Sequence, residues 1–192
     1  MNERLYLSFW LNGYTEHNML RHFEKALWCF PFSRLRGEAI LRIHALEFAE
    51  PPILERLFER ETTAQDLVEA AREFQHADCA YQLECWWDIW QLEQEWKLQP
   101  CRVIVTCFGP LFESEWGEQI QFEFGVHSQF LPAATDAGSM TALRSNIRSL
   151  LHLAEEIEER IPVSKRTLWS ESGENLAEQL QNALGGLSPH RE

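Results

Sequence analysis

The stretch "CWWDIWQLEQEW", residues 85–96, holds four of the chain's eight tryptophans. Two periodicities fit it. With a period of two, Trp86 and Trp90 lie on one side of a strand and Trp87 on the other; with a helical period all three share a face. The aromatic content favours a strand within residues 79–96, although the pattern alone leaves both readings open. The fold, and any recognition surface built on these indoles, depends on which period holds.

Length and composition predict a folded globular chain. Of the 192 residues, 45% are apolar and 12% aromatic, which is enough for a sizeable core and unlike a disordered sequence. No low-complexity linker divides the chain, and no internal repeat is clear enough to claim. We therefore expect a single domain over residues 1–187, followed by a flexible tail at 188–192.

Cysteine usage and the N-terminal segment predict a soluble, cytoplasmic protein. The five cysteines are odd in number and include no Cys-x-x-Cys pair, so we expect reduced, buried thiols rather than a disulfide framework. The apolar run near the N-terminus is too short for a signal peptide. No segment approaches the run of about 18 apolar residues that spans a membrane.

The charge balance narrows the expected partners. Acidic residues outnumber basic ones by 30 to 17, giving a net charge of −13 at pH 7. Such a surface repels phosphate backbones and anionic lipids, so we expect neither nucleic acid nor membrane as a partner. A basic protein suits the charge, although solubility alone would also explain it.

Apolar periodicity predicts an α+β fold. Residues alternate as in strands at 4–11, 37–46, 101–108 and 118–127, in addition to the tryptophan-rich segment. Helical spacing covers residues 15–30, 62–74, 140–161 and 170–186, with Thr15 as the expected N-cap of the first helix. We predict a mostly antiparallel sheet of about five strands, with the helices packed largely on one face.

Sequence motifs of common enzyme classes are absent. The chain contains no dinucleotide-binding glycine motif, phosphate-binding loop, nucleophile elbow or zinc-protease helix motif. Cys85, Cys101 and Cys107 fall on three successive predicted strands, but their spacing is not that of a zinc site, and core thiols explain them better. We expect no cofactor and no metal.

The face of the predicted sheet away from the helices is the more informative feature. Its side chains have the opposite parity to the apolar residues of each strand, and combine large rings with ionisable groups of both signs. The predicted ligand- or partner-binding residues are Arg42, His44, Glu84, Trp86, Asp88, Trp90, Glu123 and His127. The same parity adds Tyr6, Ser8, Trp10, Arg102, Thr106, Phe108 and Gln121. Alternatively, this is an ordinary solvated face whose tryptophans are covered by residues 47–60 or by a second subunit.

Three functions follow from this face. The first is a non-enzymatic binding or protein-interaction module, with a basic protein or a second copy of the chain as its partner. An enzyme acting on a polar small molecule is the main alternative, with His44 or His127 as general base and Glu123 or Asp88 as its carboxylate partner. A structural homo-oligomer subunit is the third. We favour the first because catalytic motifs are missing.

Overall fold

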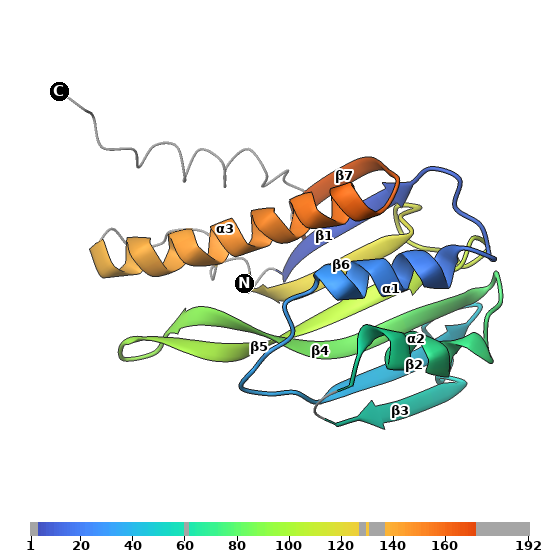
Figure 1. Cartoon of the computed structure of the whole chain (residues 1–192), viewed down its shortest axis with the longest axis horizontal. Coiled ribbons are helices and arrows are strands. Elements are labelled where there is room, and N and C mark those ends of the chain that lie inside the picture. The colour runs from blue at the N-terminus through green and yellow to red at the C-terminus, as the bar shows by residue number, and fades with distance from the viewer. Residues whose placement is uncertain (1–3, 60–61, 127–129, 131–136, 172–192) are drawn as a thin grey trace.

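The computed structural model describes residues 4–59, 62–126, 130 and 137–171 (Figure 1). Within these residues, seven strands form one antiparallel sheet in the order β3-β2-β4-β5-β6-β1-β7, and three helices accompany them. The predicted α+β class with an antiparallel sheet is confirmed. The sheet is wider than predicted, with seven strands rather than about five.

The tryptophan-rich segment is a strand. β4, Cys79–Leu92, pairs with β5, Trp96–Phe108, over an unbroken antiparallel register from Ala80↔Phe108 to Leu92↔Trp96. Burial alternates along β4: Trp87 is buried, and Trp86 and Trp90 are half-buried on the other side. The period of two therefore holds, and it sorts the indoles between the two faces of the sheet.

The remaining strands extend this pair on both sides. β2, Ala39–Ala45, pairs with β4, and β3, Leu54–Phe58, forms one edge. On the other side β6, Ile120–Val126, follows β5, as expected for a meander. β1, Arg4–Leu11, lies between β6 and β7, so the first strand of the chain is internal to the sheet.

Two strands were not predicted, β3 and β7, Val163–Ser170. Each pairs with only one neighbouring strand along the sheet. Their sequences, "LERLF" and "VSKRTLWS", are rich in charged and polar residues, and more than half of β3 is exposed. An edge strand needs little apolar alternation and is often charged, so the periodicity that marks central strands is weak here.

The helices match their predicted apolar stripes. They are α1, Met19–Cys29, α2, Ala64–Arg72, and α3, Ala137–Arg160. α2 has a capping box in which Thr63 and Asp66 exchange hydrogen bonds. The expected cap of α1 was wrong: Asn18 is the N-cap, because its side chain accepts from the amide of Thr15 and holds a turn ahead of the helix.

The core lies between the sheet and the helices (Figure 1). Odd-numbered residues of β1 and β4, such as Leu7, Phe9 and Leu83, are buried in one cluster with apolar residues of all three helices. The opposite parity of each strand forms a second face, which we call the open face. The open face carries the polar and aromatic side chains considered below.

The part of β4 that follows its pairing with β2 has one edge without a strand partner among the described residues. A side chain of α3 and the loop after α1 cover this edge. The buried amide of Asn146, on α3, accepts from the Trp90 amide and donates to the Trp90 carbonyl, both at 2.9 Å. Nearer to β2, the Ser33 amide donates to the Trp86 carbonyl at 2.8 Å. These contacts satisfy backbone groups that a strand partner would otherwise satisfy.

The predicted helix at 170–186 begins at Ser170, which is the last residue of β7; residues 172–186 of that prediction and the tail at 188–192 lie outside the described residues. Within the part of the chain that the structure describes, no helix is long and apolar enough to cross a membrane.

Replacing Asn146 with Ala is expected to destabilise the protein by about 2 kcal/mol, because two backbone groups of Trp90 lose their partners in a largely buried setting. Urea denaturation measures the change, and hydrogen exchange at the Trp90 amide should accelerate. Ser145→Ala, at an exposed neighbouring position of α3, is the control and should change stability by less than about 0.5 kcal/mol. Equal effects of both substitutions would contradict the role assigned to Asn146.

Candidate functional site: an acidic, aromatic-lined pocket

Three of the predicted site positions lie on the open face but serve ion pairs or packing there. Arg42 donates to Glu84 at 2.9 Å and to Glu55 at 2.6 Å, and Arg102 donates to the same oxygen of Glu84 at 3.0 Å. Hydrogen bonds from the two guanidiniums, that of Arg102 foremost, lower the pKa of Glu84 to about 2. His44 is buried, with the Phe48 ring edge-on to it at 5.1 Å.

The predicted carboxylate Asp88 and the indole of Trp86 are engaged by the loop that follows α1. Asp88 accepts from the hydroxyl of Ser33 and from the amide of Arg34 at 2.8 Å. The guanidinium of Arg36 lies 3.6 Å from the centre of the Trp86 ring. The segment that covers this part of the open face is therefore residues 33–36, rather than the 47–60 segment considered from the sequence.

Of the other three predicted positions, Trp90 and Glu123 lie on different strands and not beside each other. Trp90 lies on the long β4–β5 hairpin, opposite Leu98. Glu123 lies on β6, on the open face, next to a pocket. His127 lies outside the described residues, so its position stays a prediction. Of the eight predicted residues, Glu123 alone among those described lines this pocket.

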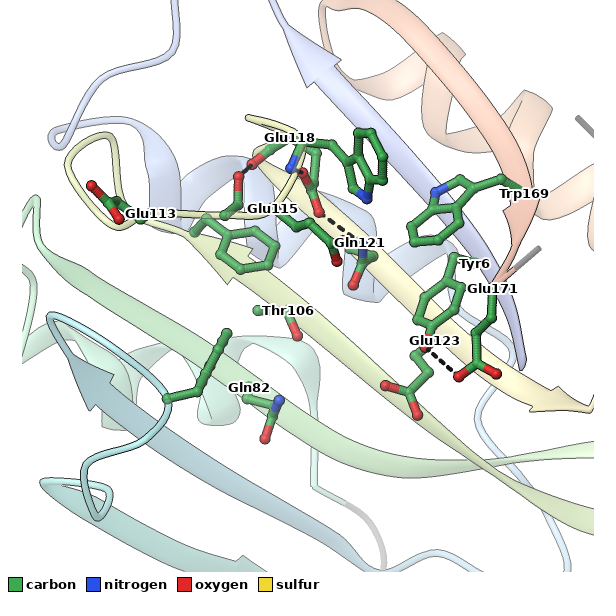
Figure 2. Close-up of a pocket in the computed structure, with 14 residues that line it drawn as sticks. Tyr6, Gln82, Thr106, Glu113, Glu115, Glu118, Gln121, Glu123, Trp169 and Glu171 are labelled. Carbon is green, nitrogen blue, oxygen red and sulfur yellow. Dashed lines mark hydrogen bonds between the residues drawn. The ribbon is translucent and has the colours of Figure 1, made fainter. Parts of the chain in front are cut away.

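The pocket is a hollow of about 730 Å³ on the open face, over β1, β4, β5, β6 and β7. Figure 2 shows its lining side chains. We call it the acidic pocket. Its floor carries polar side chains from three neighbouring strands, Gln82, Thr106 and Gln121. The volume is within the range of small-ligand sites, roughly 300–1,000 Å³.

Aromatic rings from two regions line the acidic pocket. On the β1–β7 side, Tyr6 stacks on Trp169 with ring centres 4.3 Å apart, and Trp116 meets Trp169 edge-on at 5.9 Å. Across the pocket, Phe48 and Phe108 meet at 6.1 Å, where β5 ends and the loop after β2 returns. Such rings offer both apolar contact and electron-rich faces for a cation.

Carboxylates supply the charge of the pocket. The described residues that line it include five glutamates and no Lys, Arg or His. They come from three places: the loop between β5 and β6, strand β6, and the end of β7 (Figure 2). In chain order they are Glu113, Glu115, Glu118, Glu123 and Glu171. Arg4, at the rim, pairs with Glu123 at 2.7 Å and offsets one of these charges.

Glu118 is the most deeply placed of these acids, with 2% of its surface exposed. Its two oxygens accept from the Trp116 amide at 3.1 Å and from the Gln121 side chain at 2.8 Å. Both donors are neutral, and no ion pair of Glu118 occurs among the residues that the structure describes. Among the described residues, the donors that hold this buried carboxyl group are therefore an amide of the backbone and an amide side chain rather than a cation.

The titration of Tyr6 reflects the same environment. Burial is the main cause that raises the pKa of its hydroxyl, and the negative charges of Glu123 and Glu171 raise it further. Two of the pocket's carboxylates thus act on one phenol, which indicates a negative potential at the β1–β7 wall.

The loop between β5 and β6, residues 109–118, is held in place at both ends. Gly109 donates to the carbonyl of Cys79 at 2.8 Å, and a Cβ at Gly109 would lie only 2.3 Å from the carbonyl oxygen of Ala77. The indole of Trp10 donates to the carbonyl of Trp116 at 3.3 Å. The close approach at Gly109 requires glycine and sets the start of the acidic loop.

Sequence reasoning found part of the pocket and missed part. Parity correctly placed Tyr6, Thr106, Phe108, Gln121 and Glu123 on the open face. It missed the residues of the 109–118 loop and of β7, because a connection has no periodicity and β7 was not predicted. The available signal was the loop's composition, "ESEWGE", which places three acids around a tryptophan.

The thiols are part of the core, as predicted. All five cysteines are free and buried. Burial raises the pKa of Cys107 to about 12, which disfavours the nucleophilic thiolate. Among the described residues no group of three or more His, Cys, Asp or Glu side chains is arranged to hold a metal ion.

Comparisons with known proteins add no identification: no family model matches the sequence, and no similar curated protein or solved structure is found. Function is therefore argued from the geometry of the open face alone.

Replacing Glu84 with Gln is expected to destabilise the protein by about 1–2 kcal/mol at pH 7, allowing for solvent screening of its two ion pairs. Because the pKa of Glu84 falls from 4.5 to about 2 on folding, this stabilisation is present above pH 4.5 and is lost as the pH falls toward 2. Urea denaturation at several pH values should show the gap between wild type and variant narrowing over that window.

Glu55→Gln is the matched control, since Glu55 is exposed and pairs with Arg42 alone. It should change stability by less than about 0.5 kcal/mol. A gap for Glu84→Gln that stays constant between neutral pH and pH 3 would show that the two guanidiniums do not hold its carboxylate ionised.

Proposed function

We propose that the protein is a non-enzymatic binding module whose acidic pocket receives cationic side chains of a basic protein. The observation that supports this most directly is the lining of the pocket, where the described residues supply five carboxylates and five aromatic rings and no basic side chain. A ligand ammonium or guanidinium would gain both charge pairing and contact with ring faces.

The fold's own cations support the same chemistry. On the open face, Arg36 lies over Trp86, and the ammonium of Lys165 lies 4.3 Å from the centre of the Trp10 ring. Among the described residues no such cation covers Trp116 or Trp169 at the acidic pocket. A cation from a ligand could lie against Trp116 or Trp169 as Arg36 lies against Trp86.

The surroundings of two of the predicted catalytic groups, His44 and Asp88, favour binding over catalysis. His44 packs beneath Phe48 and is not among the residues that line the pocket. The carboxylate of Asp88 is already bonded to the 33–36 loop. Neither group is placed to transfer a proton to a ligand in the pocket.

We expect a short glycine–lysine peptide to bind the protein, and the same peptide with Gln in place of Lys not to bind. Isothermal titration calorimetry measures both affinities. Affinity should fall as sodium chloride rises from about 50 to about 500 mM, because the contacts are partly solvent-exposed ion pairs. The triple variant Glu113→Gln, Glu115→Gln and Glu171→Gln should bind the lysine peptide about tenfold more weakly, at roughly 0.5 kcal/mol per exposed charge.

The control is a second triple variant, Glu73→Gln, Glu155→Gln and Glu159→Gln, at exposed positions on α2's C-cap and α3. It removes the same net charge away from the pocket and should leave affinity within about twofold of wild type. Equal weakening by both variants would mean that overall charge, and not the acidic pocket, attracts the peptide.

A further inference from the structure

A second hollow adjoins the acidic pocket on the open face. It measures about 200 Å³ and is lined by Trp10, Trp116, Lys165, Thr167 and Trp169. We call it the tryptophan hollow. It shares Trp116 and Trp169 with the acidic pocket, so the same two indoles form part of both linings. One ligand lying across Trp116 and Trp169 would therefore contact both.

Two of the three indoles of the tryptophan hollow, those of Trp10 and Trp169, are held by hydrogen bonds at their nitrogens. Trp10 donates to the Trp116 carbonyl at 3.3 Å, and Trp169 donates to the buried hydroxyl of Ser8 at 3.1 Å. The stacked Tyr6 ring supports Trp169 further. Rings fixed in this way lose little conformational entropy when a ligand stacks on them.

The charge of the tryptophan hollow is opposite to that of its neighbour. The described residues of its lining include no carboxylate, and the one ionisable group among them is Lys165, whose ammonium lies against Trp10. A second cation in this hollow would be repelled by Lys165 and would compete with it for the ring. The two hollows therefore select differently: the acidic pocket favours a cation, and the tryptophan hollow favours a neutral, apolar group.

The position of the tryptophan hollow in the sheet indicates how an extended ligand would bind. Trp10 stands on β1, whose two edges are already paired with β6 and β7, while Lys165, Thr167 and Trp169 stand on the neighbouring strand β7. A ligand on this face therefore gains no ladder hydrogen bonds to β1. A polyproline II segment does not need such bonds, because its backbone stays solvated and its conformation is preformed, and aromatic grooves are its usual receptors.

We propose that the tryptophan hollow is a second subsite that takes a proline ring of the same basic segment whose Lys or Arg enters the acidic pocket. This inference rests on the proposed function and specifies its ligand: a proline-containing basic segment rather than any polycation. Trp116 and Trp169 provide the continuity between the two subsites, and Lys165 provides the discrimination against a second cation.

Four short peptides test the proposal by calorimetry at low salt: one with lysine and proline, one with alanine for proline, one with glutamine for lysine, and one with both changes. Wild-type protein should bind the lysine–proline peptide about three- to tenfold more tightly than its alanine counterpart. In Trp10→Ala this preference should disappear while the preference for lysine over glutamine persists.

Lys165→Glu provides a second variant. Lys165 is exposed to solvent, so this substitution disturbs folding less than Trp10→Ala does. A peptide with lysine in place of the proline should bind this variant at least threefold more tightly than it binds wild type, because the repulsion becomes an attraction. Lys165→Gln should lie between the two.

The outcomes separate the two proposals. Lysine-dependent binding with equal affinity for the proline and alanine peptides would overturn the second subsite and leave the proposed function standing. Loss of any lysine dependence would overturn the proposed function itself. The role of the tryptophan hollow would also be overturned if Lys165→Glu preferred the lysine–proline peptide over the peptide with lysine in place of proline by the same factor as wild type.

Discussion

The antiparallel pairing of β4 with β5 is the constraint on which the rest of the structure depends. Its register runs without interruption from Ala80↔Phe108 to Leu92↔Trp96. Because consecutive side chains of a strand point to opposite faces, this register sends Trp87 into the core and Trp86 to the open face. A shift by one residue would exchange these faces and place Glu84 among the buried apolar residues. The same pairing brings Phe108 and Gly109 to the point where the acidic loop begins.

Sequence patterns predicted those parts of the fold that bury a face. Strands such as β1 and β6 carry strict apolar alternation, and α3 carries a long apolar stripe, since one side of each must face the core. β3 and β7 were not predicted, because edge strands bury less apolar surface and need no apolar alternation. The same difference explains which residues of the acidic pocket were predicted. Glu123 was predicted from its parity on a central strand. Glu118 and Trp169 were not, because their positions follow from a loop and from an edge strand.

The open face shows why an aromatic, charged surface does not by itself mark a binding site. Trp86 and Asp88 have the side chains expected of a recognition surface, yet the chain's own 33–36 loop engages both. Arg42, Arg102 and Glu84 likewise satisfy one another. What distinguishes the acidic pocket is an imbalance: its carboxylates and indoles have too few cations of the chain's own to pair with them. That imbalance, rather than the content of tryptophan, supports the proposal of an external cation.

The place of β1 in the sheet has a consequence for how the molecule is made. β1 is the first strand of the chain, but its two neighbours are β6 and β7, whose residues follow it by more than a hundred positions. Pairing over such separations requires the closure of long loops, which slows folding relative to local pairing. During synthesis, the β2–β4–β5 region can form while β1 still lacks both partners. The wall formed by Tyr6 and Trp169 is therefore assembled only after β7 has left the ribosome.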